Sequence, residues 1–152
     1  MRKLKNILIT GGAGFIGSNF IRYLFNMSAL PGGLFTDAKF TEKIINVDSL
    51  TYCGNLENLI EVENKYGINA GKKQRYFFEH CDICDREKIQ KIFEKYNIDT
   101  VVHFAAESHV DRSILGPETF VKTNVMGTFT LLDCAKEFWK NSDGSIRDDV
   151  LF

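Results

Sequence analysis

Three glycines spaced three residues apart, Gly11, Gly14 and Gly17, stand between the short apolar run Lys5–Thr10 and an amphipathic segment. Glycine permits a tight turn and lets the backbone approach a pyrophosphate closely, while the first turn of a following helix offers free N–H groups to an anion. A structural turn that binds nothing would also use glycines. The predicted strand before the loop and the predicted helix after it favour a dinucleotide-phosphate loop.

A carboxylate, Asp48, ends the second apolar run, Ile44–Asp48. At the carboxyl end of a strand beside the glycine loop, it would accept hydrogen bonds from the ribose hydroxyls of a dinucleotide and repel a 2′-phosphate. Its separation from Gly17 exceeds the usual distance of about 20 residues, and we attribute the excess to an insertion at Ser28–Lys43. Because Ser49–Asn55 contains no arginine, we expect NAD rather than NADP.

Two further segments belong to the ends of predicted strands. Asp82 and Ile83 follow the third strand, where Asp82 could accept from the adenine amino group while Ile83 packs on the ring. The run His103–Ser113 (HFAAESHVDRS) ends the fourth strand and continues beyond it. Its small residues would let a cofactor lie close to the backbone, and its polar residues would line the site beside the nicotinamide. A Ser-His-Asp triad is not expected, because consecutive loop residues cannot converge on one another.

The four cysteines include a Cys81-x-x-Cys84 pair, which could indicate a redox pair or half of a zinc site. A structural zinc needs about four ligands, and the sequence has neither a second such pair nor a histidine at ligand spacing. We therefore expect no metal site, and reduced thiols as in a cytosolic protein.

Apolar runs with strand character alternate with amphipathic segments of helical period. The predicted strands are Lys5–Thr10, Ile44–Asp48, Arg75–Glu79 and Thr100–Ala105, and the predicted helices are Gly14–Met27, Asn55–Tyr66, Asp85–Tyr96 and Pro117–Phe138. This alternation predicts βαβ units and an α/β fold, a Rossmann-like doubly wound parallel sheet with helices on both faces. The last helix carries an apolar row of Val121, Val125, Phe129, Leu132 and Phe138.

Two segments interrupt this rhythm and are predicted to be loops, Ser28–Lys43 and Gly67–Lys73. Near the end of the chain, Val150–Phe152 resembles the beginning of a fifth strand, so we expect a sheet truncated at the start of that strand. We interpret residues 1–152 as the N-terminal portion of a longer protein, an NAD-binding domain without the C-terminal part that binds substrate.

Composition excludes several classes of protein. The chain has 152 residues, 44% of them hydrophobic and 26% charged, with a net charge of −1. These values are those of a globular chain and give no sign of a nucleic-acid partner. The apolar stretches are far too short for a membrane span, and the N-terminus does not have the pattern of a signal peptide. We expect a cytoplasmic protein.

Five segments together carry a resemblance to a known family: TGGAGFIG, VDSLTYCGNLENL, FEHCDICD, HFAAESHVDRS and KTNVMGTFTLLDCA. They resemble the extended short-chain dehydrogenase/reductase family over nearly the whole chain. The first segment marks only the broad family. LTY-x-GN and AAESHVDRS are more specific, and are similar to the N-terminal part of the nucleotide-sugar 4,6-dehydratases that act on dTDP-glucose.

This resemblance implies an NAD site in which Ser108 also faces the sugar of a nucleotide-sugar substrate, and it implies a homodimer. In the family, a hydride passes from the sugar C4 to NAD, water is eliminated across C5–C6, and the hydride returns to C6. The implied cofactor contacts are Gly11, Gly14, Phe15, Ile16, Gly17, Asp48, Ser49, Leu50, Thr51, Gly54, Asp82, Ile83, Phe104, Ala105, Ala106, Ser108 and Thr123.

The chain departs from the family in its catalytic residues. The family uses a Thr-Asp-Glu motif and a Tyr-x-x-x-Lys pair, and neither occurs in these 152 residues. We therefore expect no catalytic residue in this chain and no turnover by it alone. Two alternatives stay open: another nucleotide-sugar epimerase or dehydratase, such as one acting on a UDP-sugar, and a non-catalytic NAD-binding module. A truncated sheet would also expose apolar surface, which predicts low stability or self-association.

Overall fold

Four parallel strands form the centre of the fold. A computed structural model describes residues 5–25 and 43–152, and its strands lie in the order β3-β2-β1-β4. Their bounds are β1 Asn6–Thr10, β2 Lys43–Asp48, β3 Tyr76–His80 and β4 Thr100–His103. Ile7 of β1 is in register with Ile44 of β2 on one side and with Thr100 of β4 on the other. This is the strand order of a Rossmann-like sheet, so the predicted fold class is confirmed.

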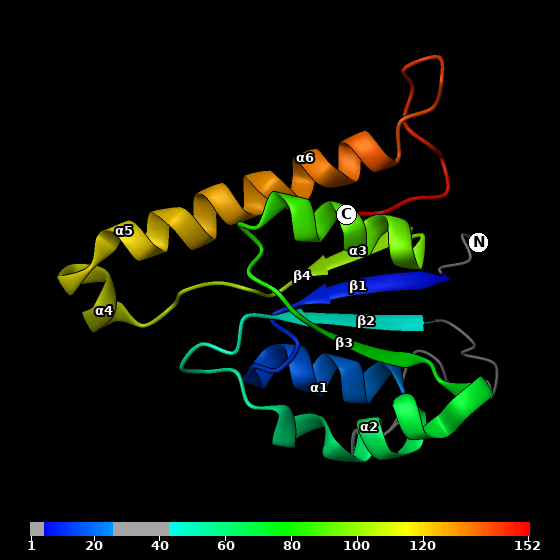
Figure 1. Ribbon diagram of the computed structural model, residues 1–152. Helices are drawn as coiled ribbons and strands as arrows, with labels where there is room; N and C mark the ends of the chain where they lie inside the picture. Colours follow the sequence, from blue (N-terminus) through cyan, green and yellow to red (C-terminus); the bar gives the residue numbers. More distant parts are fainter. Residues whose placement is uncertain (1–4, 26–42) are drawn as a thin grey trace.

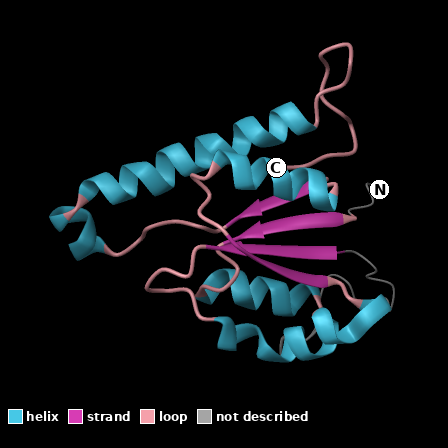
Figure 2. Ribbon diagram, in the orientation of Figure 1, coloured by secondary structure: helices cyan, strands magenta, loops and turns pink. Residues whose placement is uncertain are grey.

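Helices cover both faces of the sheet, as Figures 1 and 2 show, with α1 and α2 on one face and α3 and α6 on the other. Their bounds are α1 Phe15–Leu24, α2 Ile60–Tyr66, α3 Arg86–Tyr96, α4 Val110–Leu115, α5 Pro117–Phe120 and α6 Thr128–Phe138. A 3₁₀ turn, η1 (Leu56–Leu59), leads into α2. In the described ranges, no helix combines the length and the apolar character needed to cross a membrane.

Each face of the sheet has its own apolar core, because successive side chains of a strand point to opposite faces. Ile7 and Ile9 of β1 pack with Ile21 of α1 and Val62 of α2, whereas Leu8 packs on the side of α3 and α6. All three β1 residues are almost fully buried. Burial on both faces is why the strands have continuous apolar runs instead of alternating polar and apolar residues.

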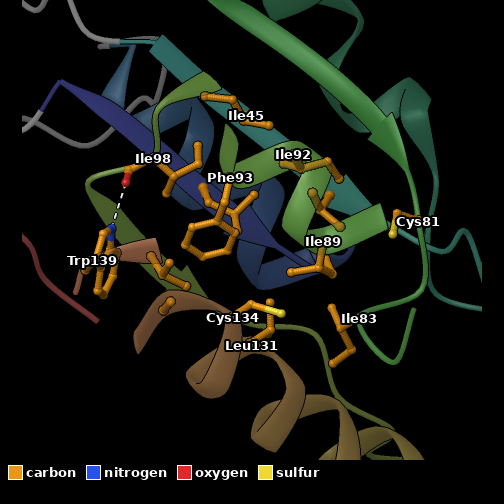
Figure 3. Packing of buried hydrophobic residues seen from close by; sticks show 14 of the residues in the cluster. Ile45, Cys81, Ile83, Ile89, Ile92, Phe93, Ile98, Leu131, Cys134 and Trp139 are labelled. Atoms are coloured by element: carbon orange, nitrogen blue, oxygen red, sulfur yellow. Dashed lines mark hydrogen bonds between the residues drawn. The ribbon is translucent and has the colours of Figure 1, made fainter. Parts of the chain in front are cut away.

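The core under α3 and α6 is closed by the only tryptophan, Trp139 (Figure 3). Its indole Nε1 donates a hydrogen bond of 2.7 Å to the carbonyl of Ile98, in the turn between α3 and β4. The ring of Phe93 lies 6.0 Å from Trp139 and 5.7 Å from Phe138, centroid to centroid, in edge-on arrangements. This cluster fixes the end of the long helix to the sheet and so sets the direction in which the helix runs.

The predicted loop at Gly67–Lys73 is wrong in part, because the structure has a 3₁₀ segment, η2 (Ile68–Lys73), with a kink at Gly71. Short local hydrogen bonds explain it, since the Ala70 N–H donates to the Gly67 carbonyl at 3.0 Å. The other predicted loop, Ser28–Lys43, lies outside the described residues except for Lys43, which begins β2.

The helix predicted over Pro117–Phe138 is present, but its middle turn, η3 (Val121–Gly127), is a π-helix. The row Val121, Val125, Phe129 and Leu132 lies on the exposed side of this long helix, and it is Leu131, Cys134 and Ala135 that face the core. The short helix α4 was not predicted. A long helix that has one face on the core and a second apolar row outside leaves a surface that other chains can cover.

Strand ends also differ from the predictions. β4 ends at His103 and not at Ala105, and the described part of α1 ends at Leu24, before the predicted limit of Met27. At the far end of the chain, Leu151 forms a parallel bridge with Thr100 of β4. The predicted fifth strand therefore begins beside β4, where a Rossmann-like sheet continues.

Candidate functional site

A cavity of about 500 Å³ lies at the carboxyl ends of the strands, between the glycine loop and the loops that follow β2, β3 and β4. Its volume is in the range of small-molecule sites, roughly 300–1,000 Å³. Every predicted cofactor contact except Leu50 lines this cavity. The structure thus brings together residues from five separate segments, although their role in binding NAD stays a prediction.

The glycine loop forms the floor of the cavity and is held by very close backbone contacts. Gly11 has φ +69°, and a Cβ added there would lie 2.6 Å from the backbone nitrogen of Ala105. A Cβ on Gly17 would collide with the carbonyl oxygen of Gly11. Gly11 and Gly17 are therefore required for the loop to turn and for α1 to start where it does, while the close approach of a pyrophosphate stays a prediction.

The N-terminus of α1 points into this cavity. Gly14 is the N-cap of the helix, and the next two residues, Phe15 and Ile16, line the cavity while being 82% and 66% exposed. Apolar side chains this exposed at the rim of a cavity are accessible for contact with a ligand. The first N–H groups of a helix have no acceptor within the helix, and they carry the positive end of its dipole. The arrangement suits a phosphate group.

Asp48 joins two of the loops that line the cavity. Its Oδ2 accepts a hydrogen bond of 2.9 Å from the Ala13 N–H in the glycine loop, and its Oδ1 accepts one of 2.8 Å from the Leu50 N–H. The residue is only 8% exposed. Each carboxylate oxygen has a second lone pair, so Asp48 can hold both loops and still accept from a ribose hydroxyl. Leu50, which does not line the cavity, adopts φ +51° to complete this turn.

Asp82 and Ile83 line the cavity after β3 in different ways. Asp82 is exposed, and its Oδ1 accepts the Cys84 N–H at 2.9 Å. Ile83 is only 4% exposed, and its Cδ1 lies 2.5 Å from the position that a Cβ on Gly127 would occupy. Its side chain belongs to the core in Figure 3. Ile83 thus lines the cavity with only a small part of its side chain, and its packing on an adenine ring stays a prediction.

Of the two cysteines near this loop, Cys81 is buried and Cys84 is half-buried. Burial raises the pKa of the Cys81 thiol to about 11, with a smaller contribution from Asp85. Burial also raises the pKa of Cys84, whose Sγ donates to the Lys122 carbonyl. A raised pKa keeps both thiols protonated at neutral pH and makes them poor nucleophiles and poor metal ligands.

The loop after β4 is attached to the long helix through Asn124. The Asn124 side chain accepts from the Glu107 N–H at 2.8 Å and donates to the Glu107 carbonyl at 2.9 Å. This pair of hydrogen bonds fixes the stretch that carries Ala105, Ala106 and Ser108 over the cavity. Thr123, also predicted, lies beside Asn124 in the π-helical turn and lines the same cavity.

Sequence reasoning missed several lining residues: Val47, Cys53, Cys81, Glu107, Thr119 and Lys122. Lys122 is the most informative, because it adds a cation to the cavity lining, and a cation could pair with a phosphate group there. Its position, one residue before the predicted contact Thr123, was the available signal. Since Lys122 belongs to a π-helical turn, its direction could not be read from helical periodicity.

A cation–π contact links two loops near the cavity mouth. The guanidinium of Arg112, on α4, lies 4.1 Å from the ring centroid of Tyr52 in the loop after β2. His109 contacts the same ring edge-on at 6.2 Å. His103 does not face Ser108 or Asp111, because its ring nitrogens contact Thr10 and Thr128. His103 is therefore engaged by two threonine hydroxyls.

The family of the chain follows from comparison with known proteins. A sequence model for the family described as GDP-mannose 4,6 dehydratase matches residues 8–147. The chain belongs to this family. Among its relatives is the dTDP-glucose 4,6-dehydratase of Haemophilus influenzae, 49% identical over 149 residues, which are 98% of this chain and 38% of that protein. The chain therefore spans well under half the length of this relative.

Solved structures of similar proteins have the same fold. DesIV, a dTDP-glucose 4,6-dehydratase from Streptomyces venezuelae solved with NAD bound, is 44% identical with a TM-score of 0.70, over 88% of this chain and 36% of that one. The UDP-glucose 4-epimerase of Thermotoga maritima, solved with UDP-glucose, is 30% identical with a TM-score of 0.65, over 88% and 34%. Dehydratases and epimerases thus share this architecture, and sequence identity to the dehydratase is higher.

The close contact at Gly11 predicts a specific loss of stability. Gly11→Ala should lower the free energy of unfolding by about 3 kcal/mol or more, since it adds a collision with the backbone to the cost of about 1–2 kcal/mol for a positive φ. Gly71→Ala is the matched control, because Gly71 has φ +57° and nothing within 4 Å of the added Cβ. Urea unfolding followed by circular dichroism measures both; equal losses would contradict the close contact.

Proposed function

We propose that this chain is the NAD-binding N-terminal portion, residues 1–152, of a nucleotide-sugar 4,6-dehydratase that acts on dTDP-glucose. The observation that carries the proposal is the single cavity in which a helix N-terminus, the Asp48 carboxylate and the Ala105–Ser108 loop face one another. Membership of the family and 49% identity to a named dTDP-glucose 4,6-dehydratase support the choice of reaction.

The residues around the cavity fit NAD in chemistry and in space. Gly11, which has no room for a Cβ, lets the pyrophosphate come close to the backbone at the start of α1. Asp48 accepts from the adenosine ribose, and Asp82 lies at the adenine side. Ala105 and Ala106 are small enough for the nicotinamide half to lie along the loop after β4, next to Ser108.

When bound, NAD would supply a hydride acceptor for the sugar C4 and a hydride donor for C6. The contribution of this chain is to bind and orient the dinucleotide and, through Ser108, to contact the sugar. Proton removal and loss of water require a base and an acid. In the family these are the tyrosine–lysine pair and the Thr-Asp-Glu motif, which the 152 residues do not include.

The proposal predicts that the 152-residue chain does not convert dTDP-glucose, because its sequence lacks the tyrosine–lysine pair that would take the C4 hydroxyl proton. The measurement is product formation from dTDP-glucose with added NAD. Detectable 4-keto-6-deoxy sugar would contradict the assignment of catalysis to residues outside this chain. The residues encoded after Phe152 separate the alternatives, since Thr-Asp-Glu marks a dehydratase and its absence marks an epimerase or a non-catalytic module.

A second prediction concerns the cofactor. The protein should bind NAD more tightly than NADP, and Asp48→Asn should weaken NAD binding about tenfold or more, since it removes a charged hydrogen-bond acceptor. The same change should make the affinities for NAD and NADP more similar, because it also removes the repulsion between the Asp48 carboxylate and the 2′-phosphate of NADP. Isothermal titration with both nucleotides measures this.

The matched control for that experiment is Asp149→Asn, an exposed carboxylate paired with Arg147 and distant in the chain from the cavity-lining residues. It should leave both affinities unchanged. If Asp48→Asn weakened NAD and NADP by the same factor, its role would be limited to holding the loops. If the wild-type protein did not bind NAD at all, the proposed function would be wrong.

We further propose that the protein forms a homodimer through the exposed apolar row of the long helix, which consists of Val121, Val125, Phe129 and Leu132. These four side chains are between 46% and 58% exposed, and their spacing places them along one stripe of the helix. An apolar stripe of this kind on a surface is typical of a surface that another chain covers.

The dimer is tested by sedimentation velocity. Phe129→Glu should convert a wild-type dimer into a monomer, because a charge would be buried in the stripe. Lys136→Glu, an exposed position on the same helix, is the control and should stay dimeric. A wild-type protein that is monomeric at all concentrations would contradict the homodimer. If the 152-residue chain associated and a longer form did not, the rest of the protein would be what covers the apolar row, and the homodimer would be wrong.

A further inference from the structure

His103 stands between two threonines, one next to the cavity-lining Gly11 and the other at the end of the π-helical turn that carries Lys122 and Thr123. Its Nδ1 lies 2.6 Å from the hydroxyl of Thr10, the residue before the glycine loop. Its Nε2 lies 3.0 Å from the hydroxyl of Thr128, the first residue of α6. His103 itself is the last residue of β4. One imidazole ring therefore connects β1, β4 and the long helix.

In this series of hydrogen bonds, the groups at the two ends determine which atom donates in each bond. The Thr128 hydroxyl donates to the Asn124 carbonyl at 2.7 Å, and a carbonyl can only accept. A hydroxyl has one proton, so its contact with His103 must be accepted from an Nε2–H. The ring is then in the Nε2–H tautomer, and its Nδ1 accepts a proton from the Thr10 hydroxyl.

The other end of the chain agrees with this direction. The Thr10 hydroxyl oxygen accepts the N–H of Ala105 at 3.3 Å, which leaves its own proton for Nδ1. An imidazolium would place a second proton between Nδ1 and Thr10, and the Thr10 hydroxyl is fully buried. Burial also lowers the pKa of His103, which favours the neutral ring. Every donor in the series from Ala105 to Asn124 then has an acceptor.

The series ends on the residue that fixes the loop over the cavity. Asn124 accepts from Thr128 through its carbonyl, and through its side chain it bonds both backbone polar groups of Glu107. Asn124 lies in the π-helical turn together with Thr123 and Lys122, two residues that line the cavity. A π-helical turn departs from regular helix geometry and needs support from its surroundings.

We propose that His103, as a neutral Nε2–H tautomer, is a positioning residue for the dinucleotide cavity. It sets the distance between the glycine loop and the π-helical turn by bonding Thr10 and Thr128 at once, and it acts on a ligand only through them. The inference rests on the proposed function for the identity of that ligand, NAD. The tautomer of His103 does not depend on the proposed function, because it follows from hydrogen bonds within the protein.

The first experiment reads the tautomer directly. In protein labelled with ¹⁵N-histidine, long-range ¹H–¹⁵N correlation spectra distinguish the two neutral tautomers and the imidazolium. Of the three histidines, the one whose signals vanish in His103→Gln should be the Nε2–H tautomer at neutral pH, with or without NAD. An Nδ1–H tautomer or an imidazolium at this position would overturn the proposal, even if NAD binds as proposed.

The second experiment measures NAD affinity in a matched pair of variants. Thr128→Val removes the hydroxyl that meets His103, and Thr130→Val removes a hydroxyl on the same helix that also bonds back along the helix, to the Met126 carbonyl. Each variant loses a hydrogen bond back along the helix, and Thr128→Val should lose more stability because it also leaves the His103 Nε2–H without its acceptor. Only Thr128→Val should weaken NAD binding, by about fivefold, the value of one hydrogen bond, and Thr128→Ser should restore it.

Equal effects of Thr128→Val and Thr130→Val on NAD affinity would reduce His103 to a structural residue and overturn the positioning role. Thr128→Ser also guards against misfolding, since it keeps the hydroxyl and removes only a methyl group. A wild-type protein with the Nε2–H tautomer that does not bind NAD would refute the proposed function and, with it, the positioning of NAD, while leaving the tautomer established. The two failures are therefore distinguishable.

Discussion

The contact between Gly11 and the backbone of Ala105 is the constraint on which the site depends. β1 and β4 are neighbours in the sheet, and the N–H of Phe104, the residue after β4, still donates to the carbonyl of Thr10 at the end of β1. One residue later the two backbone segments must separate to leave a cavity. Only glycine can turn there, because a Cβ on Gly11 would lie 2.6 Å from the backbone nitrogen of Ala105. The start of α1 and the position of the loop after β4 both follow from that turn.

Each loop around the cavity is anchored by a buried or half-buried residue. Asp48 anchors the glycine loop and the loop after β2, Asn124 anchors the loop after β4, and Ile83 anchors the loop after β3 in the core. Each anchor uses a different interaction: a charge with two N–H groups, an amide with a backbone pair, and apolar packing. A rigid scaffold with functional loops at the strand ends is the common plan of such folds.

Most of the architecture could be predicted from the sequence, because strands buried on both faces and amphipathic helices have distinct periods. The glycine loop, Asp48 and the loop after β4 were predicted as one site for the same reason, since strand ends in a parallel sheet meet at one edge. The predictions failed where structure depends on neighbours. The π-helical turn at Val121–Gly127 left Lys122 unrecognised, and the 3₁₀ segment Ile68–Lys73 was predicted to be a loop.

The outward row of the long helix shows another limit of sequence patterns. Its residues have the spacing of a core-facing stripe, and the pattern does not say whether the apolar surface it meets belongs to the same chain. The core side instead uses Leu131, Cys134 and Ala135, with smaller residues that let the helix pack closely. Periodicity finds an apolar face, and only the packing of the other elements decides which face is covered.

Leu50 has a consequence for how a ligand would be received. Its left-handed backbone, at φ +51°, is costly for a residue with a branched side chain, by about 1–2 kcal/mol. The Asp48 carboxylate holds this turn in place within the protein itself. The conformational entropy of that turn is therefore lost during folding, and a ligand that needed the turn in this shape would not have to order it on binding.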